Sequence, residues 1–238
     1  MEKKKGRKRV KLAILVVTLV VAGVFVWLAS NTMNRSTMYE VARNNVSEAR
    51  FFMKQHEAEG IRVQFFSGIR EKDYQRNGIA TPTTEFGLIN VEPMNTDFAT
   101  NPLAAVRVLS GVLRIGEEAT DITLERNNYG VNFGADIARA VSAEENIVFE
   151  LTVGDEMKTF PLVNTMDEES INWERALELA VEEVEDQLGN FGQFEVHVKI
   201  LRDRTQTKSF WYVQFMNTQA QTLFVAVGAD GEVLGSTD

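Results

Sequence analysis

The chain of 238 residues contains no cysteine, only two histidines and only four prolines. The absence of cysteine excludes disulfides, thiolate metal sites, cysteine nucleophiles and lipid attachment through an N-terminal cysteine. No HExxH, GxSxG, GxGxxG or phosphate-loop motif occurs in the sequence. The usual signatures of a metalloprotease, a serine hydrolase and a nucleotide-binding enzyme are therefore missing. We expect a protein that is not an enzyme and that has no cofactor.

The two histidines and one acidic run are the remaining candidates for chemistry. His56 and His197 fall on different predicted elements, and the alternation around His197 places it on the polar face of a strand. A hydrolase would require a pocket that holds His197 beside a serine or a carboxylate. The acidic run Glu182–Asp186 lacks the alternating oxygen ligands of a calcium loop. We interpret His197 as an exposed or edge residue and the acidic run as a solvated helix face, and we predict no metal site.

The N-terminal segment combines a basic tail with a long apolar run. Residues 1–11 have a local charge of +6, whereas the whole chain carries −9, which leaves −15 for the remainder. The eighteen residues 12–29 carry no charge, which is about the minimum length that crosses a bilayer as a helix. The pattern predicts a transmembrane helix with the N-terminus in the cytoplasm and the C-terminal part outside. Leu12, Trp27 and Ala29 are the predicted membrane-anchor residues.

Two other interpretations compete with a single-pass anchor in the cell membrane. A cleaved signal peptide has small residues before the cut, but cleavage after Ala29 would place Trp27 at position −3. A basic tail also attracts nucleic acid, but a short tail directly before an apolar run is explained as an orientation signal. The acidic remainder would repel polyanions. We therefore expect an uncleaved anchor, a lipid bilayer as one partner, and no nucleic acid.

The region that follows is predicted to be a helical stalk and then a β-rich module. Apolar residues recur at helical spacing up to Gly60, which predicts a stalk over residues 30–60. From Ile61 the period changes to two, which is typical of a strand, and residues 146–163 alternate around a Gly-Asp turn like a hairpin. Residues 78–102 are loop-rich with one short strand. Residues 103–116 fit a buried helix or a buried strand, and we favour the helix. This β-rich module spans residues 61–164.

Residues 165–238 are predicted to form a second module of one helix and an antiparallel sheet. Thr165 and Glu168 have the spacing of a capping box, and Gly189 suits a left-handed C-cap. Three strands are predicted after the helix, over residues 194–201, 209–215 and 222–227. The predicted fold class is therefore α+β: an N-terminal transmembrane helix, helix-plus-antiparallel-sheet modules, and a C-terminal α-β-β-β meander.

This C-terminal order resembles the PepSY domain, a small module of protease propeptides and bacterial membrane-anchored proteins. The matching segments are the helix of residues 176–189, the strand Trp211–Phe215, and residues 224–227 with the closing Gly231–Leu234. The resemblance covers about the last 70 residues. It implies a regulatory or inhibitory binding role outside the membrane, toward peptidases or envelope enzymes, and no catalysis.

Phe210, Trp211 and Tyr212 are the candidate partner-binding residues, because both faces of their strand carry large apolar side chains. One face packs on the helix. The other either packs within the protein, which we favour, or forms an exposed patch for a partner. We predict a membrane-anchored extracytoplasmic regulatory protein that restrains or tethers an envelope peptidase or cell-wall enzyme. The alternative is a structural subunit of an envelope or secretion assembly.

Overall fold

The structure, a computed structural model, describes residues 37–237 except 73, 74, 96, 98, 99, 128, 129, 204 and 206. The chain divides into two compact units, residues 1–41 and residues 42–238. In the first unit the described residues, 37–41, are helical. The second unit contains every strand of the described chain.

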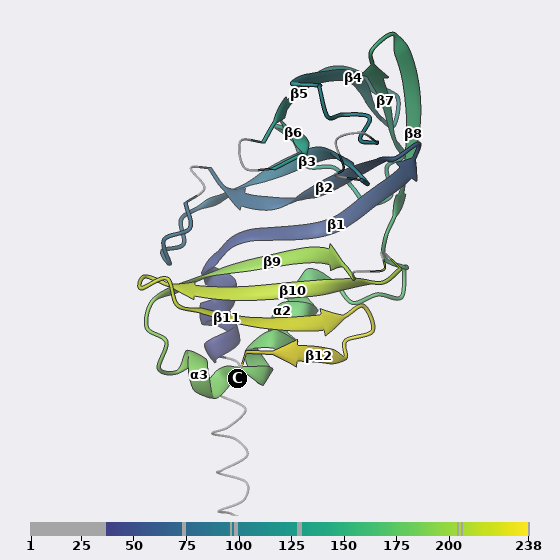
Figure 1. Ribbon diagram of the computed structural model, residues 1–238. Helices are drawn as coiled ribbons and strands as arrows, with labels where there is room; N and C mark the ends of the chain where they lie inside the picture. Colours follow the sequence, from purple (N-terminus) through teal and green to yellow (C-terminus); the bar gives the residue numbers. More distant parts are fainter. Residues whose placement is uncertain are drawn as a thin grey trace, which may run out of the picture. The chain divides into compact units, whose positions relative to one another are not determined.

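Eight strands of the second unit close into a barrel (Figure 1). The order around the ring is β1-β2-β3-β6-β5-β4-β7-β8, and β8 pairs with β1 to complete it. All pairs in the ring are antiparallel. The strands are β1 (Val46–Ala58), β2 (Ile61–Glu71), β3 (Thr83–Pro93), β4 (Val108–Ile115), β5 (Glu118–Arg126), β6 (Phe133–Ile137), β7 (Ile147–Val153) and β8 (Glu156–Asn164).

The inside of the barrel is an apolar core. Because successive side chains of a strand point to opposite faces, every second residue faces inward. Ile61, Val63 and Phe65 of β2 are fully buried there, as are Phe149 and Leu151 of β7. An eight-stranded ring has room for a packed core or for one small ligand, and here buried apolar side chains occupy the interior. A ligand is therefore expected to bind outside this ring.

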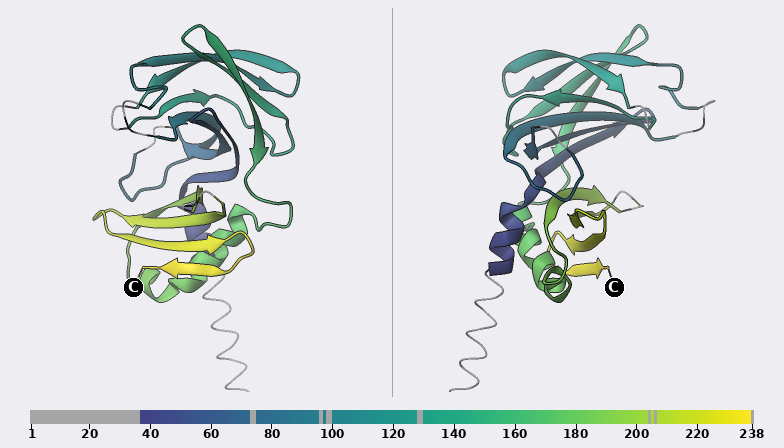
Figure 2. Two further views of the ribbon diagram at one scale, coloured as in Figure 1. Left: turned by 45° about the vertical axis from the view of Figure 1, so that its right-hand side comes forward. Right: turned by 90° about the vertical axis from the view of Figure 1, so that its left-hand side faces the viewer.

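The rest of the second unit is a helix-backed sheet. Its helices are α2 (Trp173–Glu183) and α3 (Glu185–Leu188), and its strands are β9 (Phe194–Arg202), β10 (Ser209–Asn217), β11 (Thr222–Gly228) and β12 (Val233–Ser236). Figure 2 shows α2 lying across one face of this sheet, where it contacts β10 and β11. The indole of Trp211 donates to the carbonyl of Ile171 at 3.1 Å, which ties β10 to the segment before the helix.

Strand β1 joins the two parts of the second unit. Its first residues, Val46 to Ala49, pair in parallel with Val196 to Val198 of β9, so the barrel and the C-terminal sheet form one twelve-stranded sheet. The pairing ends at Ala49 and Val198, beyond which β1 continues into the barrel while β9 continues beside β10 (Figure 1). The two strands thus form a fork.

The predicted α+β fold class is wrong, because the second unit is mostly β-structure built around a closed barrel. The predicted stalk, residues 30–60, contains the thirteen-residue strand β1 in its described part. Strand β1 is paired on both sides, and its buried residues fall on both faces. Its apolar residues therefore do not alternate simply, and their spacing imitates that of a helix.

Other elements differ from the predictions in detail. Residues 108–115 form β4 and not a helix, because they pair with β5 and β7 on either side. The helix begins at Trp173 with Asn172 as N-cap, seven residues after Thr165 would have started it. Gly189 has a φ of −57° and is not left-handed. The hairpin of residues 146–163 and the three C-terminal strands are confirmed.

The predicted membrane span, residues 12–29, lies outside the described residues. Within the described part of the chain, no helix has the length and apolar character needed to cross a membrane. The predictions of a signal-anchor, a single-pass topology and an extracytoplasmic C-terminal part are therefore corrected: the structure provides no basis for them. In the described residues the apolar side chains lie mainly in strands, whose alternation with polar residues keeps apolar runs short.

Candidate functional site

A groove lies at the fork between β1 and β9. Its volume is about 310 Å³, and it is lined by β1, β2 and β3, by Asn132, and by the end of β9. The strand alternation that places Val63 and Phe65 in the core directs Arg62, Gln64 and Phe66 outward into the groove. The groove is therefore the outer polar face of the barrel, closed on one side by the C-terminal sheet.

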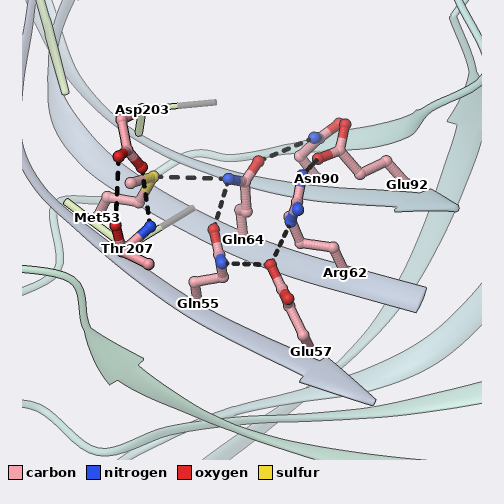
Figure 3. Close-up of polar contacts among 9 residues, drawn as sticks. All are labelled: Met53, Gln55, Glu57, Arg62, Gln64, Asn90, Glu92, Asp203 and Thr207. Atoms are coloured by element: carbon pink, nitrogen blue, oxygen red, sulfur yellow. Dashed lines mark hydrogen bonds and ion pairs between the residues drawn. The ribbon is translucent and has the colours of Figure 1, made fainter. Parts of the chain in front are cut away.

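Side-chain amides form a hydrogen-bonded row across the groove, which we call the amide row. Gln64 Nε2 donates to Gln55 Oε1 at 2.8 Å, and Asn90 Nδ2 donates to Gln64 Oε1 at 3.4 Å (Figure 3). Asn132 Nδ2 donates to Asn90 Oδ1 at 2.9 Å. The row thus crosses β1, β2 and β3. Amides both donate and accept, so a row of this kind suits a ligand that does the same, such as a peptide backbone.

Arg62 lies beside the amide row, two residues from Gln64 on β2, and is held by two carboxylates. Its Nε is 2.6 Å from Glu57 Oε1, and its Nη1 is 2.8 Å from Glu92 Oε1 (Figure 3). Burial alone would lower the pKa of Arg62, but the hydrogen bonds that it donates to Glu92 and Glu57 outweigh burial and raise the pKa. Arg62 therefore stays charged, and its charge is neutralised by its own partners.

The other two arginines of the groove differ in their partners. Arg50 Nε is 2.8 Å from Glu48 Oε1, and its guanidinium lies 4.3 Å from the centroid of the Phe66 ring. Arg202, at the end of β9, has a buried Nε with no hydrogen-bond partner in the described part of the protein. The next acidic residue, Asp203, instead accepts hydrogen bonds from Thr205 and Thr207.

The groove also borders an unpaired strand edge. The amide of Val196 donates to the carbonyl of Asn45 at 2.8 Å, so the backbone groups of β9 at every second residue face β1. Pairing with β1 ends at Val198, and within the described chain no strand pairs with this edge of β9 from Ile200 to Arg202. A short length of strand edge beside the amide row thus has no strand partner in the described chain; along it Ile200 is only 1% exposed, Leu201 is 37% exposed and Arg202 is half-buried.

A second, larger cavity of about 820 Å³ lies between β1, residues 164–172 and Trp211. At its rim Phe51, which is 37% exposed, stacks on Trp173 with ring centroids 5.9 Å apart. Its charged lining is Lys54 with the exposed acids Glu144, Asp167 and Glu168. It has no unsatisfied buried polar group among the described residues, so the groove is the better defined site.

A buried polar cluster contains the residue types of a hydrolase. Ser47 Oγ lies 2.9 Å from Glu71 Oε1 and 3.3 Å from Glu195 Oε2, and His197 Nε2 lies 3.1 Å from Glu195 Oε1. All four side chains are at most 2% exposed, so a substrate does not reach them. Burial lowers the pKa of His197, although Glu195 opposes this shift. The interpretation of His197 as exposed is therefore wrong.

The cluster holds the strands together. Glu71 accepts from Ser47 and from the backbone amide of Thr81, so it connects β1, β2 and the segment before β3. Glu195 and His197 add β9 to the same network. Buried polar groups with satisfied hydrogen bonds rigidify a structure, and we interpret the cluster in this way.

The predicted partner-binding residues lie outside the groove. Trp211 is only 1% exposed, whereas Phe210 and Tyr212 point to the other face of β10 and are half-buried. Tyr212 stacks on Phe224 at 5.9 Å, and Phe224 is 39% exposed. A partner-binding role for this strand remains a prediction. The predicted anchor residues Leu12, Trp27 and Ala29 lie outside the described residues.

Sequence reasoning missed the groove. The alternation of Arg62 and Gln64 with buried residues showed one polar face of β2. It did not show which strands lie beside β2, and the amide row exists only when β1, β2 and β3 are neighbours.

The fold and the groove together define a class: a mostly β protein in which a closed barrel shares one strand with a helix-backed sheet, with a polar groove at the fork. No family model matches the chain, and no curated protein or solved structure matches it.

Proposed function

We propose that this protein is a non-catalytic binding protein whose groove receives an extended segment of a partner protein. The observation that carries the proposal is the unpaired edge of β9 from Ile200 to Arg202, directly beside the amide row. An extended peptide adds to such an edge through main-chain hydrogen bonds, while neighbouring side chains select its sequence. The groove volume of about 310 Å³ suits a short segment.

The polar lining favours a peptide over an apolar ligand. Gln64, Asn90 and Asn132 present amide groups that complement peptide N–H and C=O groups. Leu88, Leu201 and Phe66 add apolar surface for side chains of the segment. Catalysis is disfavoured because the serine, histidine and carboxylates that lie together are enclosed.

The resemblance of residues 165–238 to the PepSY domain favours a peptidase as the partner. The protein would then restrain or tether that enzyme by holding one of its segments in the groove. This partner class is a proposal that depends on the resemblance, whereas the extended segment is inferred from the strand edge.

Photo-crosslinking of the full chain in its native cells tests the proposal. A photoreactive phenylalanine at Leu201, which is 37% exposed and lines the groove, is compared with one at Leu234, which is 57% exposed on β12. We expect adducts at position 201 that map by mass spectrometry to one short segment of one protein. Adducts scattered over many unrelated peptides would contradict the proposal. Equal crosslinking of both positions within one large complex would instead favour a structural subunit.

A synthetic peptide of the mapped segment provides the second step. Its affinity for the purified full chain is measured for wild type, for the Gln64→Ala/Asn90→Ala double variant and for Gln219→Ala, a matched change at an exposed site outside the groove. We expect the double variant to bind about thirtyfold more weakly, since two hydrogen bonds of about 1 kcal/mol each are at stake. Unchanged affinity in the double variant would place the segment elsewhere.

A further inference from the structure

Arg202 is the one residue of the described chain with a buried side-chain nitrogen or oxygen that has no hydrogen-bond partner. Buried polar groups are nearly always satisfied, so each exception requires an explanation. A guanidinium is charged at every physiological pH and offers five donors, so leaving it unpaired inside a protein is especially costly. Arg202 as a residue is half-buried and lines the groove, so its guanidinium borders the space that a ligand would occupy, although its Nε is itself buried.

The surrounding charges leave Arg202 available for a ligand. Three arginines and one glutamate line the groove, although the chain as a whole carries a charge of −9. Arg50 is paired with Glu48, and Arg62 is paired with Glu57 and Glu92. Arg202 makes no ion pair with any described residue. Arg202 is therefore the one arginine of the groove lining that has no acid paired with it among the described residues.

We propose that Arg202 binds a carboxylate of the ligand, either an aspartate or glutamate side chain or a chain terminus. The inference rests on the proposed function, because the ligand that carries the carboxylate is the extended segment in the groove. A guanidinium and a carboxylate match in a planar, two-hydrogen-bond arrangement. A singly charged carboxylate also fits better than a doubly charged phosphate, because Glu92 lines the same groove.

Small carboxylates test the site without knowledge of the natural ligand. The N–H signals of the arginine Nε groups are followed by NMR in the full chain during titration with four probes. The probes are N-acetyl-aspartate amide, N-acetyl-alanine with a free carboxylate, the neutral N-acetyl-asparagine amide, and inorganic phosphate. We expect the Arg202 signal, identified by its loss in Arg202→Gln, to shift saturably with a carboxylate probe and not with the asparagine probe.

The first two probes separate a side-chain carboxylate from a chain terminus, and either one supports the inference. An Arg202 signal that does not move with either probe would overturn it. Phosphate that binds as tightly as the carboxylates would overturn the choice of ligand class. Added salt should weaken the carboxylate shift, since the attraction is between charges.

The crosslinked segment then distinguishes this inference from the proposed function. We expect Arg202→Gln to bind the mapped peptide at least about tenfold more weakly than wild type does. Arg202→Lys should lose less affinity, because lysine keeps the charge but not the paired donors. If the peptide binds wild type and Arg202→Gln equally, the inference fails and the proposed function stands. If carboxylates move the Arg202 signal but no segment maps to the groove, the proposed function fails and the carboxylate site stands.

Discussion

Glu48 shows how a single side chain supports the junction between β1 and β9. It is only 4% exposed, and its carboxylate meets Arg50 at 2.8 Å and Lys199 at 3.0 Å. Burial raises the pKa of Glu48, but Arg50 and Lys199 together outweigh burial and lower it to about 2. Burial also lowers the pKa of Lys199 despite Glu48, which offsets part of the gain. The ion pairs nevertheless favour the folded state at neutral pH.

We expect Glu48→Gln to lower the free energy of unfolding by roughly 2 kcal/mol at pH 7, because two cations lose their shared partner. The folded pKa of Glu48 lies below its ordinary value of 4.5, so its stabilisation is present above about pH 4.5 and is lost as the pH falls toward about 2. Urea unfolding at pH 7 and pH 3 measures this. The difference in free energy of unfolding between wild type and Glu48→Gln should be smaller at pH 3 than at pH 7. The control Glu117→Gln, at an exposed turn, should match wild type at both pH values. A difference in free energy of unfolding that grows on acidification would contradict the lowered pKa of Glu48.

At the scale of elements, β1 depends on a close approach to β2 that only glycine permits. A Cβ on Gly68 would lie 1.9 Å from the carbonyl oxygen of Ala49, so the two backbones are in contact there. This approach adjoins the β-bulge between Arg50 and Phe52, the point at which the β1–β2 register shifts. The bulge occurs where β1 separates from β9, so Gly68 helps to form the fork.

We expect Gly68→Ala to destabilise the protein by roughly 3 kcal/mol, since backbone must move to admit the methyl group. Gly235→Ala is the matched control, because nothing lies within 4 Å of its added Cβ. Thermal unfolding of both variants measures the difference. A Gly68→Ala variant as stable as the control would show that the backbones are not in contact at this position.

The elements that the sequence predicted well have a clear alternation of apolar and polar residues. The hairpin of residues 146–163 and the strands 194–201, 209–215 and 222–227 alternate as expected. Two elements were missed: β1 has buried residues on both faces, and the apolar residues around β4 fit a helix as well as a strand. The candidate site was missed for a related reason: Gln55, Gln64 and Asn90 lie far apart in the sequence and meet only through strand pairing.

For the whole molecule, the shared strand β1 predicts that barrel and C-terminal sheet unfold together. Residues 42–238 form one compact unit, and unfolding of the barrel would remove the partner of β9. Two of the three tryptophans, Trp173 and Trp211, lie in the C-terminal part, whereas Leu113 is buried in the barrel core. The two parts can therefore be observed separately.

We expect Leu113→Ala to lower the free energy of unfolding by about 3 kcal/mol through the cavity that it leaves. Denaturant unfolding is followed by tryptophan fluorescence and by far-ultraviolet circular dichroism. Both probes should give the same midpoint, at a lower denaturant concentration than in wild type, because both parts share β1. An early circular dichroism transition with unchanged tryptophan fluorescence would show instead that the barrel unfolds alone.

The sequence alone determined the periodic features of the protein. Alternation specified the one-faced strands, helical spacing specified the helix around Ala176 to Leu188, and the absence of cysteine excluded thiol chemistry. These features follow from residues close together in the chain, so local pattern is sufficient to predict them.

Only the tertiary structure decided the closure of the barrel, the double role of β1, the burial of His197 and the position of Arg202. Each of these depends on which strands become neighbours. Closure brings Lys54 and Gln55 of β1 against Asn164 and Val163 of β8, more than a hundred residues away. Pairing over such distances is selected by the packing of the whole core, and no local pattern in the sequence encodes it.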